Sequence, residues 1–290
     1  MTLVTILIVL LIDRLLWQGD PLREHRWYDR YTDRLLNLAT GQWLAKKDHG
    51  ALWLLLPPLL LVAVLQWLGG NTAGLVIGVG VLLFALGPRD LGRDTDAYLT
   101  ARARGDDDRS QETATALAGE DAPTEEPARA LAVAQGLLRQ SLPRLFAPLL
   151  WFVLLGPLGA ALYRLTDLTA RRSSRHDKAP SQLADSARRM LALLDWLPAR
   201  LTVAAFAAAG SFDAVSRVWR EHQRAEAGQR DADVLLVSAG EAALDSWPDE
   251  EEIAAGEPAP VVEDALALVW RSLAVWMVAL LVLTLLAAAL

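Results

Sequence analysis

Long apolar runs alternate with charged segments along this chain. The clearest run, residues 272–290, contains no charged residue and would be about 28 Å long as a helix. That length fits the hydrocarbon core of a bilayer, and Arg271 marks its expected inner end. The pattern therefore predicts a C-terminal transmembrane helix.

A second apolar region consists of residues 51–68 and 73–86, separated by a Gly-Gly-Asn turn. We interpret it as a transmembrane hairpin. Its second half is short, and Gly74, Gly78 and Gly80 predict close packing against a neighbouring helix, because small residues let helix backbones approach each other.

Residues 145–163 are long enough to span a membrane, but Gly156 and Pro157 interrupt them. Proline removes a backbone hydrogen bond and glycine weakens a helix, so the pattern predicts two halves. A strongly basic loop, residues 171–178, follows them. A single crossing would place this loop outside, against the positive-inside bias. A re-entrant or interfacial arrangement is therefore favoured, and a straight span is the alternative.

The remaining segments also indicate helices. Residues 1–12 are too few to span a core of ~30 Å, so we expect a half-inserted or packed helix there. A helical pattern begins near Pro127, and Ser181 is a candidate N-cap for a helix over residues 183–197. The predicted fold class is an all-α integral membrane protein, a polytopic helical bundle with a cytosolic helical portion.

The alternation of apolar and polar segments divides the chain into six parts. They are an N-terminal apolar helix with a basic cytosolic segment (1–50), the transmembrane hairpin (51–87), a polar cytosolic segment (88–144), a membrane-embedded or interfacial core (145–210), an acidic soluble segment and linker (211–264), and the C-terminal transmembrane helix (265–290). Basic residues flank the hairpin on both sides and favour a cytoplasmic location for its flanks. The pattern predicts a membrane protein with several passes.

Composition narrows the function classes. Of 290 residues, 53% are hydrophobic and 22% are charged, which suits membrane segments separated by polar pieces. The formal net charge is −7 and no basic patch is present, so nucleic acid is not an expected partner. The chain has no cysteine, no GxxxxGK[ST] phosphate loop and no HExxH motif. No catalytic residue and no metal site is predicted from these patterns.

Four ionisable residues lie at the edges of apolar runs: Arg164, Asp167, Asp195 and Arg200. Such groups are costly beside a membrane, so they usually have partners or line a watered cavity. Two interpretations are open. The residues form ion pairs that hold helix ends together, or they line a ligand pocket.

Five short motifs occur in a fixed order along the chain. They are Gly19, Asp20 and Pro21 (GDP), GRDT at 92–95, APLLW at 147–151, LYR at 162–164 and DWLPARLT at 195–202. This order resembles the CobD/CbiB superfamily of membrane proteins over nearly the whole chain. The opening residues, DAYLTARARGD and DWLPARL are most similar to its AmpE family, which is implicated in β-lactamase induction.

The resemblance also bears on activity. In the cobalamin branch, which is an ATP-dependent ligase, the helix before APLLW carries acidic residues. The matching positions here are Gln135, Arg139, Gln140 and Pro143. A ligase of this kind needs carboxylates to hold Mg²⁺ against phosphate. The resemblance therefore implies a regulatory member of the AmpE type, located in the bacterial inner membrane, without ligase activity. An adenosylcobinamide-phosphate synthase-like ligase, using a nucleotide with magnesium, is the alternative.

The resemblance further implies a candidate anion pocket that faces the cytosol. Its residues are Arg93, Asp94, Thr95, Arg164, Asp167, Asp195 and Arg200. Guanidinium groups suit bidentate contacts with anions such as a nucleotide or a cell-wall metabolite, but they also pair with structural carboxylates. A scaffold of internal ion pairs is therefore the alternative. A protein partner or a homo-oligomer is also left open beside the lipid bilayer.

Overall fold

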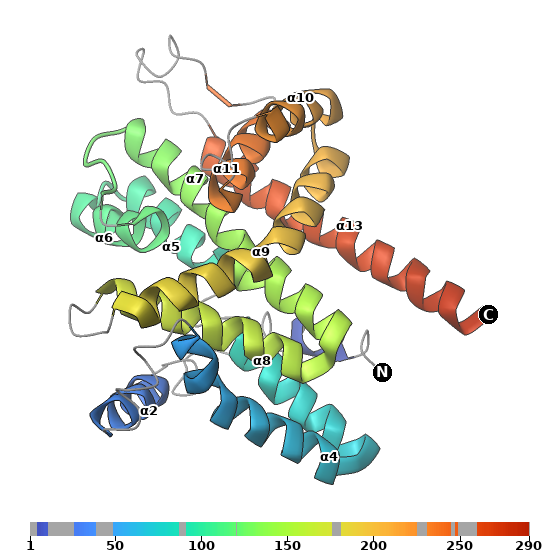
Figure 1. Cartoon of the computed structure of the whole chain (residues 1–290). Coiled ribbons are helices and arrows are strands. Elements are labelled where there is room, and N and C mark those ends of the chain that lie inside the picture. The colour runs from blue at the N-terminus through green and yellow to red at the C-terminus, as the bar shows by residue number, and fades with distance from the viewer. Residues whose placement is uncertain are drawn as a thin grey trace. The chain divides into compact units, whose positions relative to one another are not determined.

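The computed structural model describes residues 5–10, 26–38, 49–86, 91–119, 121–175, 181–224, 231–244, 247–248 and 260–289. Within these ranges the regular elements are helices, and none is a strand, which confirms the predicted all-α class (Figure 1). The chain divides into two compact units. The first comprises Met1–Pro88 with Pro143–Leu197, and the second comprises Arg89–Leu142 with Pro198–Leu290.

The first unit is built on α4 (Gly50–Ala85) and α8 (Ala147–Arg175), which pack against each other. Leu55 and Phe84, from opposite ends of α4, pack in one cluster with Leu165 of α8. A straight helix of 36 residues would be ~54 Å long and could not bring its two ends to one cluster. The chain therefore reverses direction within α4, as Figure 1 shows.

A sharp break divides α8. Gly156 has φ 67° and ψ −157°, a backbone conformation that glycine adopts without a Cβ clash, and Pro157 follows it. The interruption predicted at these two residues is confirmed. A re-entrant position in a membrane stays a prediction.

Two further helices complete the first unit. The short helix α2 (Arg26–Asn37) places Tyr28 and Tyr31 against α4 and α8. Helix α9 (Ser181–Ala209) begins at the residue proposed as its N-cap and continues through Pro198 into the second unit. Its buried positions Leu183 and Ala187 pack in a cluster with residues of α4 and α8.

In the second unit, helix α7 (Ala128–Ser141) packs against several others. Its neighbours are α6 (Asp107–Ala118), α11 (Ala232–Ala243) and α13 (Val261–Ala289). Helix α5 (Leu91–Ala103) packs on α6, and α10 (Phe212–Arg224) packs on α11. A π-helical turn, η1 (Leu142–Phe146), follows α7 at Pro143, where proline removes a backbone donor.

The glycines that permit close helix contact are not those that the sequence suggested. A Cβ at Gly136 would lie 2.8 Å from a backbone carbon of α6, and one at Gly240 would lie 2.6 Å from a side chain of α7. By contrast, a Cβ at Gly74 or Gly80 would meet no described atom within 4 Å, and Gly78 has only ordinary contacts of 3.6 Å. Within the described part of the chain, Gly78 therefore lies in ordinary contact with α8, whereas no close contact is found at Gly74 or Gly80.

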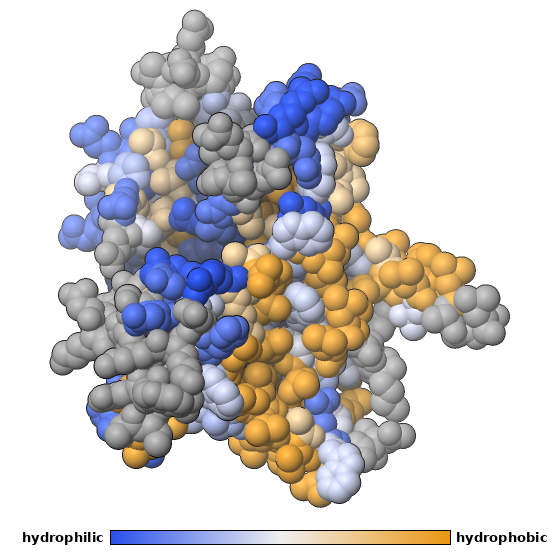
Figure 2. Space-filling model, viewed as in Figure 1, coloured by the Kyte–Doolittle hydropathy of each residue, from blue (hydrophilic) through white to orange (hydrophobic). Residues whose placement is uncertain are grey.

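Four helical segments are long and apolar enough to cross a membrane. They are Gly50–Leu68, Ala128–Arg172, Gln182–Ala209 and Val261–Leu286. Only 17% of the apolar window in α4 and 28% of that in α13 is buried within the chain. Figure 2 shows hydrophobic side chains over the surface of α4 and along the exposed part of α13. Such surfaces require an apolar surrounding, which a bilayer supplies.

The acidic segment at residues 211–264 contains more regular structure than a linker. Helices α10 and α11 both lie in it, and α13 begins at Val261, before the expected start at 265. The residues at 249–259, which carry the linker-like sequence, lie outside the described residues.

Candidate functional site

The second half of α8 holds a buried ion pair. Arg164 Nη1 donates to Asp167 Oδ2 at 2.9 Å, and the two side chains are 5% and 1% exposed. Arg171 Nε donates to the other carboxylate oxygen, Oδ1, at 2.6 Å. Spacings of three and four residues place these side chains on one helix face. Asp167 thus accepts from two guanidinium groups, while Nε of Arg164 has no hydrogen-bond partner among the described residues.

A second set of contacts joins α8 to α9. The Tyr163 hydroxyl donates to Asp195 Oδ1 at 2.7 Å, and Trp151 Nε1 donates to the carbonyl oxygen of Leu194 at 3.1 Å. Tyr163 is fully buried and precedes Arg164 in the chain. Asp195 therefore accepts a hydrogen bond from Tyr163, the residue that precedes the paired Arg164.

Ion pairs also join the end of α8 to α2. The two terminal nitrogens of Arg172 each donate at 2.6 Å, one to Asp29 Oδ1 and the other to Asp33 Oδ1. The two aspartates are four residues apart, so they lie on the same face of α2. The hydroxyls of Tyr28 and Thr169 lie 2.6 Å apart in the buried part of this contact. A planar guanidinium presents two separate donor nitrogens to the two carboxylates, whereas an ammonium group has a single nitrogen.

The phenols of α2 are kept neutral by their surroundings. Burial raises the pKa of Tyr28 well above its usual value, and the hydrogen bond with Thr169 opposes this shift in part. Burial also raises the pKa of Tyr31 to about 12, and its hydroxyl donates to the carbonyl oxygen of Leu54 at 2.9 Å. Both side chains therefore act as neutral hydrogen-bonding groups at physiological pH.

The residues of the candidate anion pocket are divided between the two units. Arg164, Asp167 and Asp195 belong to the first unit, whereas Arg93, Asp94, Thr95 and Arg200 belong to the second. Three of the latter lie in the first turns of α5, where buried Thr95 donates to the carbonyl oxygen of Leu91 at 2.7 Å. The structure brings Arg164 and Asp167 together, and a single pocket formed by all seven stays a prediction. The motif residues Gly19, Asp20 and Pro21 lie outside the described residues.

The residues that the resemblance matched to the acidic cluster of the cobalamin branch make structural contacts here. Gln135 Nε2 on α7 donates to Glu241 Oε1 on α11 at 2.7 Å. Burial raises the pKa of Glu241, and the hydrogen bond from Gln135 opposes the shift. The neutral acid is thus favoured relative to an exposed glutamate.

Two other residues of α7 contact the end of α6. Arg139 Nη2 donates to the carbonyl oxygen of Ala118 at 2.6 Å, and Gln140 Nε2 donates to that of Leu117. The last carbonyls of a helix lack partners within it and carry partial negative charge. Arg139 and Gln140 therefore cap α6. Within the described residues, no group of three or more His, Asp or Glu side chains could hold a metal ion.

Sequence reasoning missed several of these residues. The spacing of four between Asp167 and Arg171 could have revealed their pair, since both lie on one helix. Arg172 was noted only as part of a basic loop. Its contacts with α2 and the pairing of Gln135 with Glu241 join residues more than 100 positions apart. No local pattern predicts such contacts.

Long apolar helices with exposed hydrophobic faces, together with ionisable groups that are paired where they are buried, define an all-α polytopic membrane protein. The chain belongs to the AmpE family, whose family model, "Regulatory signalling modulator protein AmpE", matches residues 1–247. This confirms the resemblance that the motifs indicated.

Two similar proteins carry the name "Cobalamin biosynthesis protein CobD". The one from Stutzerimonas stutzeri is 29% identical over 94% of this chain and 94% of its own length. The one from Chromobacterium violaceum is 27% identical over 93% of this chain and 92% of its own length. No solved structure matches the chain.

Proposed function

We propose that this protein is a regulatory or sensory protein of the bacterial inner membrane, acting in β-lactamase induction and the cell-wall stress response, without ligase activity. The observation that carries the proposal is the use of Arg139 and Gln140 to cap α6. The resemblance to the cobalamin branch matches Arg139 to a glutamate. Here Arg139 carries a positive charge, and both residues are engaged with backbone carbonyls.

The chemistry of phosphoryl transfer explains why this matters. Mg²⁺ is held by carboxylates and must neutralise the charge that develops on phosphate. Gln135 is uncharged, and burial favours the neutral form of the neighbouring Glu241. Mg²⁺ binds ionised carboxylates, and burial disfavours that form of Glu241, so this contact between α7 and α11 supports a regulatory role better than a ligase.

The test of regulation uses a strain that lacks this protein. We expect its β-lactamase activity after exposure to a β-lactam to differ from that of the parent, and we expect the intact chain to restore the parental response. Equal induction in the deletion strain and the parent would contradict the proposal.

The alternative is an adenosylcobinamide-phosphate synthase-like ligase. It is favoured by the similarity to two CobD proteins over almost their full lengths. A synthase-deficient strain supplied with cobyric acid distinguishes the two functions, with the Stutzerimonas stutzeri protein as the control expected to support growth. We expect no growth with this chain, and rescue would overturn the regulatory proposal in favour of the ligase.

We also propose that Arg164 of the first unit contributes to an anion site. Its buried and unused Nε donor supports this role, whereas its ion pair with Asp167 supports a scaffold. Native mass spectrometry with ATP and Mg²⁺ separates the two. An added mass that is lost in Arg164→Ala supports the site, and an unchanged apo mass supports the scaffold.

A further inference from the structure

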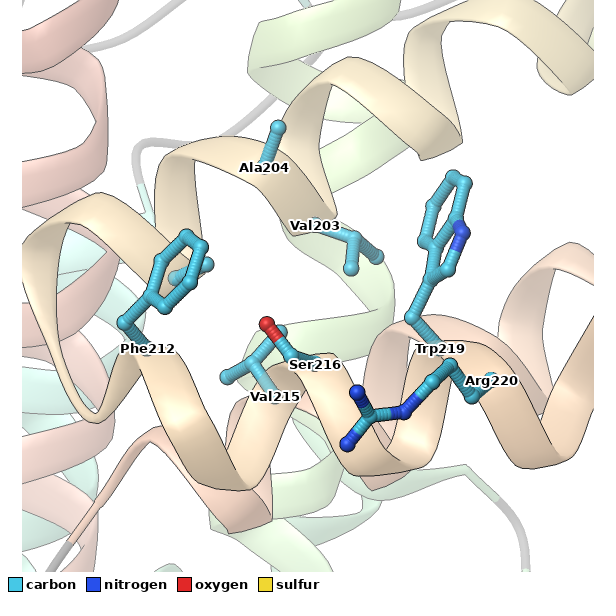
Figure 3. A pocket seen from close by; sticks show the side chains of 8 residues that line it. Val203, Ala204, Phe212, Val215, Ser216, Trp219 and Arg220 are labelled. Atoms are coloured by element: carbon cyan, nitrogen blue, oxygen red, sulfur yellow. The ribbon is translucent and has the colours of Figure 1, made fainter.

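An apolar pocket of about 330 Å³ lies between the end of α9 and helix α10, within the second unit. Val203 and Ala207 contribute to it from α9, and Phe212, Val215 and Trp219 contribute from α10 (Figure 3). This volume is at the lower end of the range for small-molecule sites. The lining offers an apolar surface to a hydrocarbon group.

One cation adjoins this apolar lining. Figure 3 shows the side chain of Arg220 reaching back along α10 toward Ser216. Among the described residues Arg220 has no ion pair, and none of the residues that line the pocket is a carboxylate. A guanidinium group is well suited to a phosphate, because its N–H donors match the phosphate oxygens. The pocket thus combines an apolar wall with an anion-binding group.

The position of α10 in the chain relates the pocket to a membrane. It follows directly after α9, whose segment Gln182–Ala209 is apolar and long enough to cross a bilayer. Its residues Phe212, Val215 and Trp219 line the pocket, whereas Arg217 and Arg224 lie outside the lining and are exposed. Phe212 is 66% exposed at the start of the helix. Amphipathic helices with arginines on the polar face and aromatic residues on the other lie in the membrane interface.

We propose that the pocket between α9 and α10 binds one anionic phospholipid, with an acyl chain along the apolar lining and the phosphate at Arg220. A free phosphate would use Arg220 but leave the apolar wall without a partner. A zwitterionic lipid would use the wall but has no net charge to match the guanidinium. The combination of both features selects a lipid with net negative charge.

The test is native mass spectrometry of the full chain in micelles that contain equal amounts of dioleoyl phosphatidylglycerol and dioleoyl phosphatidylcholine. We expect the chain to retain phosphatidylglycerol in preference to phosphatidylcholine. Arg220→Gln should lower the bound phosphatidylglycerol about fivefold, the usual effect of one basic residue near an anionic surface. The matched control is Arg217→Gln, which removes the same charge from the same helix outside the pocket and should have little effect.

A second variant tests the apolar part of the site. Ala204 lines the pocket and is exposed, so Ala204→Phe fills the space without disturbing the core. It should reduce lipid retention while leaving every charge in place, which keeps the test decisive if Arg220→Gln fails to fold. Three outcomes would overturn the proposal: equal losses in Arg217→Gln and Arg220→Gln, equal retention of the two lipids by the intact chain, or displacement of the lipid by inorganic phosphate.

Discussion

The buried pair between Arg164 and Asp167 allows a quantitative test of the first unit. In Asp167→Asn the side chain keeps its shape but loses its charge, so Arg164 stays buried without a counter-ion. Removing one partner of a buried pair costs about 3–5 kcal/mol, because the other charge is left uncompensated. The amide oxygen can still accept one hydrogen bond, so we expect the free energy of unfolding to fall by about 3 kcal/mol.

The chain offers a control with the same spacing. Arg188 and Asp185 also form a pair between residues three apart on a helix, at 3.4 Å, but their side chains are 60% and 61% exposed. Exposed pairs contribute little, at most about 1 kcal/mol. Asp185→Asn should therefore lower the stability only slightly. A larger loss in Asp167→Asn is then due to the burial of its pair, because the spacing of the two pairs is the same.

The assay is thermal unfolding of the purified chain in mild detergent, followed by tryptophan fluorescence. We expect the midpoint of Asp167→Asn to fall clearly below those of the parent and of Asp185→Asn. The double variant Arg164→Met with Asp167→Leu should recover most of the loss, because apolar residues of similar volume can replace a buried pair. The reasoning is wrong if Asp167→Asn and Asp185→Asn have the same thermal midpoint, or if the double variant is no more stable than Asp167→Asn.

Three further predictions follow from the structure. Burial raises the pKa of Glu241 in the folded state, so its stabilising contribution is complete below the ordinary carboxyl pKa and is lost as pH rises through the raised value. The thermal midpoint of Glu241→Gln should therefore increase relative to that of the parent as pH rises, and a difference that stays constant with pH would exclude this effect. In Gly136→Ala the added methyl group meets the backbone of α6 and should lower the midpoint, whereas Gly80→Ala meets no described atom within 4 Å and should not; equal midpoints would contradict the close contact. Since the chain has no cysteine, Asp108→Cys gives a single label on the segment expected in the cytoplasm; an impermeant maleimide should label it only after spheroplasts are lysed, and labelling of intact spheroplasts would refute this topology.

Much of the secondary structure could be predicted from local patterns. Apolar runs long enough for a bilayer indicated the C-terminal helix and α4, and Gly156 with Pro157 indicated the break in α8. These features depend on neighbouring residues alone, since helix length, hydropathy and backbone conformation are local properties. The motif order was likewise sufficient to indicate the AmpE family.

The candidate site was only partly accessible in this way. Arg164 and Asp167 stood out because charges beside apolar runs need partners, and their spacing of three allows them to pair on one helix. The ion pairs of Arg172 with Asp29 and Asp33 join distant segments, so they depend on how α2 packs against α8.

The sequence by itself determined the helical class and the membrane-spanning candidates. Only the tertiary structure decided what Arg139 and Gln140 do, because their partners are backbone carbonyls at the end of another helix. It also decided which glycines permit close contact, since a side chain's available space depends on the helix packed against it. Residue type is fixed along the chain, whereas burial, pairing and capping arise only when distant segments pack together.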